Sequence, residues 1–211
     1  DNGSKERLSI GAEWKGELKV GLWVETALHI PYQKGKDVSF AFVVGVDYTL
    51  RVMDGLYFML QYYYNHSGLT DSAKYPINTK EGQADLAKQL QQPTSSSAVS
   101  GVGIAIGGES FIARHYLLFM SRLTISENIN VSVMALWNLV DFSAMLAPTF
   151  SWTFLDNFSL NVGVYFLLGP DASEFHLGKI KIESLELLGA SKEGISLMPS
   201  TLFFGWLKYS F

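Results

Sequence analysis

Side chains along much of this chain alternate with a period of two, and this alternation limits the folds open to it. From Val38 to Leu50, one parity carries large apolar residues and the other carries small or polar ones. Successive side chains of a β-strand point to opposite faces, whereas a helix would spread the apolar set around its whole circumference. The segment is therefore predicted to be a strand with one apolar and one polar face.

The same alternation recurs along the sequence. Turn signals separate the alternating segments, and they are Lys15-Gly16, Asp54-Gly55, Ser126-Glu127-Asn128 and Asp156-Asn157. The predicted strands are 7–14, 18–28, 38–50, 56–64, 113–125, 129–139, 143–154, 158–168 and 201–211. We therefore predict an all-β, antiparallel chain with these nine strands.

Residues 129–155 admit another reading, because they contain a single charged residue, Asp141. A long apolar stretch with so little charge is also typical of a membrane-spanning helix. Asn138, Asp141 and Pro148 interrupt the stretch, and the alternation continues through both of its halves. We therefore favour two strands over one helix.

The length of the strands and the chemistry of their faces favour a lipid environment. Many of the predicted strands have about ten residues, the length that a tilted strand needs to cross a membrane, whereas strands of soluble proteins average about 5–6. The apolar parity ends in aromatic residues, and charged residues make up only 17% of the 211 residues. These features predict a transmembrane β-barrel segment over residues 1–211, with the polar parity facing a lumen.

The end of the chain resembles the assembly signal of Gram-negative outer-membrane β-barrels. Leu207, Tyr209 and Phe211 occupy alternating positions up to the last residue, and Gly205 precedes them. The resemblance implies a location in the bacterial outer membrane, with outer-membrane lipid and the barrel assembly machinery as partners. It also implies that Phe211 lies at the periplasmic edge.

That orientation sorts the connections between the predicted strands. The short turns all become periplasmic, and the inserts 29–37, 65–110 and 169–200 all become extracellular loops. Short inner turns and long outer loops are expected of such barrels. Within the inserts, residues 81–92 are predicted to form a short helix and residues 179–182 a short extra strand.

The odd number of strands predicts that the chain is part of a larger barrel. An antiparallel barrel closes with an even number of strands, and a strand edge left in lipid would have unsatisfied backbone polar groups. We therefore expect further strands, either N-terminal to this chain or on another chain. The stretches 46–65 and 114–175 agree with this expectation, because they resemble the later strands of large porin-like proteins.

The polar parity supplies the candidate functional residues, because it would line the lumen. These residues are Glu13, Lys15, Lys19, Glu25, Asp47, Gln61, Arg114, Arg122, Asn130, Asn138, Asn161 and Lys208. One interpretation is a pore wall whose charges set ion preference. The other is a satisfied ion-pair network inside a plugged or narrow barrel, since buried charges must be paired.

Signals of other chemistry are weak. His29, His66, His115 and His176 are dispersed, and no spacing singles out a nucleophile or a zinc site. The glycine-rich residues 101–108 lack the Lys-Ser/Thr that follows a phosphate loop. The chain has no cysteine, and its net charge of -4 provides no basic surface for nucleic acid. We therefore predict no catalytic residues, no metal, no cofactor and no nucleic-acid partner.

Passive transport is the leading functional prediction. A porin-like channel would let small polar solutes diffuse through its lumen, with wall charges that bias ion choice and loops that narrow the opening. Two alternatives stay open. One is a structural or anchoring subunit of an outer-membrane assembly, and the other is a binding surface displayed on the loops.

Overall fold

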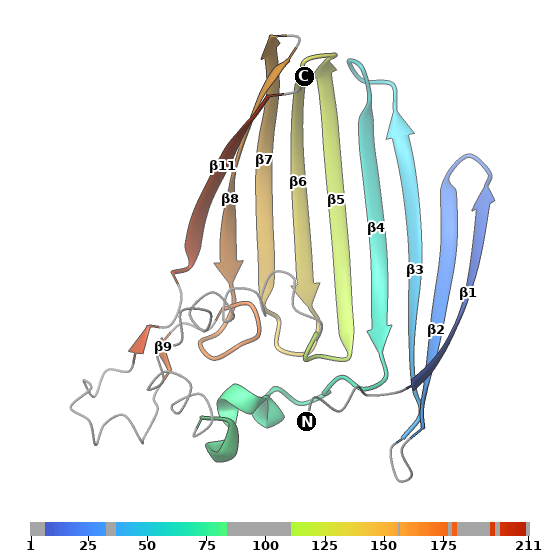
Figure 1. The fold of residues 1–211 in the computed structure, drawn as a ribbon, viewed down its shortest axis with the longest axis vertical. Coiled ribbons are helices and arrows are strands. Elements are labelled where there is room, and N and C mark those ends of the chain that lie inside the picture. Colours follow the sequence, from blue (N-terminus) through green and yellow to red (C-terminus); the bar gives the residue numbers. More distant parts are fainter. Residues whose placement is uncertain are drawn as a thin grey trace.

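The chain forms one large antiparallel β-sheet (Figure 1). The computed structural model describes residues 7–32, 37–83, 111–155, 157–176, 179–180, 195–196 and 199–209. Nine strands lie side by side in chain order, with β11 following β8. Their bounds are β1 Arg7–Glu17, β2 Gly21–Pro31, β3 Ser39–Leu50, β4 Leu56–Asn65, β5 His115–Ser126, β6 Ile129–Asn138, β7 Ala144–Leu155, β8 Phe158–Leu168 and β11 Thr201–Tyr209.

All nine predicted strands are confirmed, but the first turn was misplaced. Lys15-Gly16 is not a turn, because β1 continues to Glu17 and pairs residue by residue with β2 from Glu17↔Gly21 onward. The turn falls on residues 18–20, where Leu18 is 85% exposed. The ring of Trp14 packs over Gly16, since it lies 2.8 Å from the point where a Cβ at Gly16 would be. Glycine therefore serves here as a strand residue beneath an indole ring.

The inserts contain only short elements among the described residues. Two 3-10 turns, η1 Ser72–Lys74 and η2 Pro76–Asn78, follow β4. A helical turn then begins at Lys80, where the Thr79 hydroxyl oxygen accepts a hydrogen bond from the Gly82 backbone N–H. The rest of the helix predicted over 81–92 lies outside the described residues, which end there at residue 83.

A small second sheet bears out part of the predicted extra strand. β9, Lys179–Ile180, pairs antiparallel with β10, Ile195–Ser196. Residues 181 and 182 of that prediction lie outside the described part of the chain.

The two ends of the large sheet differ in their connections (Figure 1). Residues 18–20, 51–55, 127–128 and 156–157 join strands at one end, which we call the short-turn end. The connections 32–38, 66–114, 139–143 and 169–200 all belong to the other end, which we call the long-loop end. The predicted separation of short turns from long inserts is thus confirmed.

The pairing register keeps the apolar parity of every strand on one face of the sheet. Thr26, Phe42 and Tyr64 follow one another across β2, β3 and β4, and Leu60, Phe119 and Ala135 do so across β4, β5 and β6. The same face continues through Phe150 and Val162 to Gly205 on β11. We call this side the apolar face and the opposite side the polar face.

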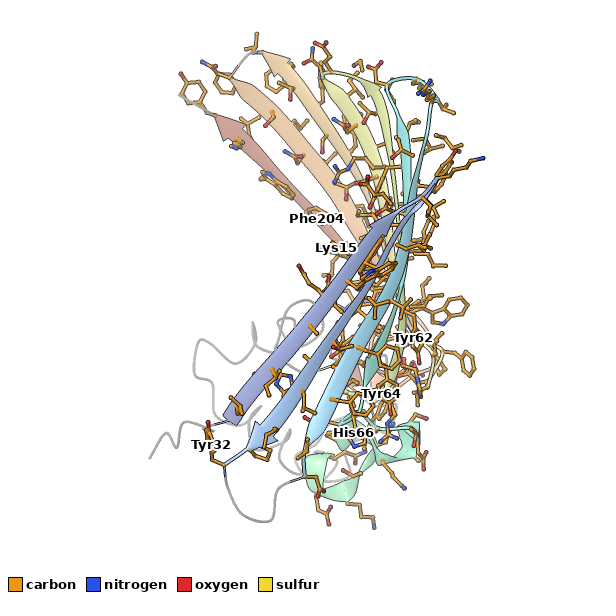
Figure 2. All side chains as sticks on the ribbon, turned by 90° about the vertical axis from the view of Figure 1, so that its right-hand side faces the viewer. Lys15, Tyr32, Tyr62, Tyr64, His66 and Phe204 are labelled. Carbon is orange, nitrogen blue, oxygen red and sulfur yellow. The ribbon has the colours of Figure 1, made fainter. Side chains whose placement is uncertain are left out.

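The sheet twists and curves, as Figure 2 shows from its side. Tyr62 and Tyr64, on the apolar face, point to the outer side of the curve. Phe204, on the polar face, lies on the opposite side. The apolar face carries most of the large exposed hydrophobic side chains of the strands, from Leu8 and Ile10 on β1 to Leu207 and Tyr209 on β11.

Loops at the long-loop end fold over part of the polar face. The hydrophobic core of the described residues consists of Tyr75, Ala113, Tyr116, Met145, Leu167 and Phe175, which come from both loops and strands. We call residues 66–83, 111–114, 139–143 and 169–176 the loop cap. No comparable core covers the apolar face within the described residues.

The sheet is open. β1 and β11 are its two edges, and each has one neighbouring strand. The prediction of an all-β antiparallel fold is therefore confirmed, whereas these nine strands do not close into a barrel. No described strand pairs with the outer side of β1 or β11, so the described strands form a sheet rather than a ring.

Aromatic rings lie flat over glycines of neighbouring strands on the polar face. Trp23 of β2 occupies the space that a Cβ at Gly45 of β3 would need, and Phe204 of β11 does the same at Gly163 of β8. Large rings that lie along the sheet in this way add apolar contact without projecting from it. The small residues of the polar parity thus have a packing role.

Gly45→Ala should destabilise the sheet by about 1–3 kcal/mol, because the new methyl group would displace the Trp23 ring. Gly11→Ala is the matched control, since its Cβ would meet only the Thr26 carbonyl oxygen at 3.5 Å. That variant should stabilise the sheet by about 0.5–1 kcal/mol through the loss of unfolded-state entropy. Denaturant titration followed by tryptophan emission measures both, and equal effects would contradict the packing at Gly45.

Candidate functional site: the polar face and its loop cap

Nearly all of the predicted wall residues lie on the polar face. Glu13, Lys15, Glu25, Asp47, Gln61, Arg122, Asn130, Asn138, Asn161 and Lys208 alternate with apolar-face residues along their strands. Their common side follows from a register that stays in phase through the strand centres, since a shift of one residue there would reverse the faces. The sheet therefore collects on one surface polar residues that are far apart in the sequence.

Three of the predicted wall residues have other surroundings. Lys19 lies in the turn between β1 and β2. Arg114 precedes β5, and its Nε donates a hydrogen bond to the Gly68 carbonyl at 3.0 Å, which holds the side chain in the loop cap. Asn138 shares the polar face but is 0% exposed. The loop cap covers it.

The charged residues of the polar face make few ion pairs. Lys15 Nζ lies 3.7 Å from a carboxylate oxygen of Glu13, and both side chains are exposed. Glu13 is directly opposite Glu25, a like-charged neighbour. Within the described residues, Asp47, Arg122 and Lys208 take part in no ion pair. This arrangement is typical of a wetted surface, because charges buried away from water need partners.

Polar residues of the short-turn half hydrogen-bond across strands. Thr124 Oγ1 donates to Asn130 Oδ1 at 3.0 Å, and Ser151 Oγ donates to Asn161 Oδ1 at 2.7 Å. The register places Asn130 opposite Ser151, which joins the two pairs into one row across β5 to β8. Together with Arg122, this row gives the short-turn half its polar character.

The middle of the polar face is apolar instead. Met59, Met120 and Met134 are direct neighbours across β4, β5 and β6. Leu136 and Met145 form the next row toward the long-loop end, and there they contact the loop cap. The polar face is therefore divided into a polar short-turn half and an apolar centre that leads under the loops.

A buried polar cluster ties the loop cap to the sheet, and Glu174 is its centre. The Glu174 carboxylate accepts hydrogen bonds from the Tyr116 hydroxyl at 2.6 Å, from Asn138 Nδ2 at 2.7 Å and from the Ile112 backbone N–H at 2.9 Å. Asn138 Nδ2 also donates to the Tyr75 hydroxyl at 3.0 Å. One carboxylate thus joins two strands to two loops.

Asp141 forms the second centre of this cluster and is 8% exposed. One carboxylate oxygen accepts from the backbone N–H and the hydroxyl of Ser143, at 2.8 and 2.7 Å. The other accepts from the Glu174 backbone N–H at 2.8 Å. Gly169, whose φ is 143°, lies against Ser143, where a Cβ would come within 2.7 Å of the serine Cβ. A hydrogen bond and a close packing contact therefore join the loop after β6 to the loop after β8.

Burial dominates the electrostatics of the cluster. It raises the pKa of the Glu174 carboxyl above its usual value, although the hydrogen bonds from Tyr116, Ile112 and Asn138 act in the opposite direction. Burial likewise raises the pKa of the Tyr75 hydroxyl to about 12. Glu174 and Asp141 lie within one network without a cationic side chain among their hydrogen-bond partners. Donated hydrogen bonds therefore stabilise these carboxylates.

Sequence reasoning missed this cluster. Glu174, Tyr75 and Ser143 lie in connections without a repeating pattern, and Asp141 drew notice only as a residue that interrupts an apolar stretch. Tyr116 and Asn138 share the polar parity of neighbouring strands, and that parity was the only signal that placed them together.

Other chemistry finds little support. The structure brings together no group of three His, Asp or Glu residues suited to a metal ion within its described part. His115 Nδ1 hydrogen-bonds the Tyr62 hydroxyl at 2.7 Å on the apolar face, whereas His29 contacts Ser9 on the polar face. Among the described residues, no helix is long and apolar enough to cross a membrane.

Known proteins offer no guide to this site, because no family model, curated protein or solved structure matches the chain. The polar face and its loop cap must therefore be interpreted from their own chemistry.

The raised pKa of Glu174 predicts a pH dependence of stability. Because the folded-state pKa lies above the unfolded value of about 4.5, the folded protein binds this proton more tightly. Relative to Glu174→Gln, the wild-type free energy of unfolding should rise as the pH falls from neutral through the folded pKa. The gain should be complete below the unfolded pKa.

Denaturant unfolding of both proteins at several pH values measures this difference. A difference that stays constant between neutral pH and the usual glutamate range would show that Glu174 is not buried as described. Asn130→Ala provides the control, because Asn130 lies on the polar face outside the cluster.

Proposed function

We propose that this chain is part of a transmembrane β-barrel in a bacterial outer membrane, and that the barrel is a porin-like channel for small polar solutes. The observation that carries the proposal is the apolar face, which no described segment covers across the nine strands. Soluble monomers rarely leave an apolar surface of that extent in water. Lipid is the environment that such a face fits.

Strand length supports the same environment. The nine strands contain between 9 and 12 residues. A strand tilted by about 45° needs roughly 9–11 residues to cross the hydrocarbon core of a membrane. Tyr48 and Tyr209 lie toward the short-turn end and Tyr64 toward the long-loop end, as an interfacial aromatic girdle would require.

The polar face supports a water-filled lumen. Its charges are mostly unpaired within the described residues, and its short-turn half carries a row of hydroxyl and amide groups. Solutes would diffuse along this wall, and Arg122, Asp47 and Glu25 would bias the choice of ions. The loop cap would narrow the lumen from the long-loop end. This end would be extracellular if the terminal strand ends at the periplasmic side.

Three kinds of partner follow from the proposal. Outer-membrane lipid would cover the apolar face, and further strands would pair with the edges of the sheet. The barrel assembly machinery would bind the terminal strand, where Gly205, Leu207 and Tyr209 share the apolar face. Phe211, the last residue of the proposed signal, lies outside the described residues.

A structural barrel is the second candidate, and the loop cap is the observation that favours it. Tyr75, Tyr116 and Phe175 are at most 2% exposed and form a packed core over the polar face. A lumen filled to this degree by its own loops would anchor or sheathe other components rather than conduct solutes. Measurements of single-channel conductance distinguish the two candidate functions, because only the porin-like channel should conduct.

Arginine on the apolar face should be costly. Phe42→Arg or Val133→Arg would place a guanidinium group in lipid and cost roughly 2–4 kcal/mol near the midplane of the membrane. Ser132→Arg, on the polar face of the same strand as Val133, is the matched control and should cost far less. Unfolding from lipid vesicles measures the difference. Equal costs at positions 132 and 133 would contradict the proposal that lipid covers the apolar face.

Channel recordings test the pore itself. The full-length protein in planar bilayers should give discrete conductance steps, and Arg122→Gln should shift the reversal potential toward cation preference, because a wall cation is lost. Arg51→Gln is the control, since Arg51 lies in the turn between β3 and β4. Absence of conductance would leave the structural barrel as the better proposal.

A further inference from the structure

We infer that the two edges of the sheet are completed by a partner sheet with an odd number of antiparallel strands, which a second copy of this chain in the same membrane orientation cannot supply. The inference rests on the proposed barrel and specifies the partner that would close it. It follows from the directions of β1 and β11 rather than from the number of residues in the chain.

The two edge strands run in the same direction. Each of the nine strands is antiparallel to its neighbours, so the first and the last are parallel to each other. Both run from the long-loop end to the short-turn end (Figure 1). Any strand that pairs antiparallel with β1 or β11 must therefore run the opposite way.

That requirement fixes the partner's strand number as odd. A sheet of alternating strands whose first and last members share one direction always has an odd number of strands. Added to the nine strands of this chain, it gives the even total of bacterial barrels. A single strand is the smallest such partner.

Further copies of this chain have an odd number of sheet strands, but their edge strands run in the wrong direction when all copies share one membrane orientation. In copies that share one membrane orientation, β11 of one copy would meet β1 of the next, and the two would be parallel. A copy turned over would pair correctly, but it would place the long loops on both sides of the membrane. A ring of identical chains therefore cannot be both antiparallel and uniformly oriented.

The chemistry of the edges defines the residues that the partner must carry. On the apolar face, Phe203 of β11 is 85% exposed and Ile10 of β1 is 52% exposed, because each has a neighbouring strand on one side only. Their new neighbours should be large and apolar, since cross-strand pairs on a lipid-facing surface are apolar. The partner strands should therefore alternate with the same period of two.

Leaving the edges unpaired would be costly. Each unsatisfied backbone N–H or C=O group in hydrocarbon costs several kcal/mol, and an edge strand carries a row of them. Direct pairing of β1 with β11 would satisfy these groups only through a parallel junction. Both considerations favour a partner sheet between the two edges.

Site-specific photo-cross-linking tests the inference in the intact protein within its native membrane. p-Benzoyl-phenylalanine replaces Phe203 in one sample and Ile10 in another, and mass spectrometry identifies the captured peptides. Both probes should capture strand peptides other than residues 7–17 and 201–209. Phe150, on β7 in the interior of the sheet, is the control position, where capture should be limited to β6 and β8.

The remaining outcomes overturn the inference. A link from position 203 to residues 7–17 would mean a closed nine-stranded ring or a ring of copies, and the mass of the product separates these two. Capture of no peptide at either edge would mean that no partner sheet exists. The proposal that lipid covers the apolar face is tested separately by the arginine variants. The cross-linking result at the two edges does not depend on whether arginine is tolerated at position 133.

Discussion

The backbone hydrogen-bond register from β1 to β11 is the interaction on which the rest of this structure depends. It keeps Leu60, Phe119 and Ala135 on one side of the sheet although they are far apart in the chain. A slip of one residue at any junction would move all later strands to the wrong face. The two irregularities, at Thr124–Ser126 and Thr153–Leu155, both lie at the short-turn end, so the strand centres stay in phase.

The sequence was sufficient to predict the strands because long alternation is a local signal with a single geometric explanation. It failed at Lys15-Gly16, where a glycine that looked like a turn residue lies under the Trp14 ring. It did not find Glu174, because the loop cap is built from contacts between remote segments. Neither the strand propensity of the residues nor their alternation predicts that Glu174 forms hydrogen bonds with Asn138 and Tyr116.

The loop cap and the polar face have opposite relations to water. Along the strands, charges such as Asp47 and Arg122 lack ion-pair partners within the described residues, which requires solvent around them. In the cap, Asp141 is buried and Glu174 is half-buried, and both carboxylates accept several hydrogen bonds. If the proposed channel conducts, solutes would pass between this charged wall and the hydrogen-bonded loop cap.

The Trp23–Gly45 contact also restricts how this protein evolves. The two residues lie on adjacent strands at directly paired positions, and the indole ring fills the volume where any side chain at 45 would begin. A larger residue at 45 costs less stability once the side chain at 23 has become smaller. A smaller residue at 23 that comes first leaves a gap, whereas a larger residue at 45 that comes first overlaps the indole ring. Related sequences should therefore vary at these positions together, with the change at 23 preceding the change at 45.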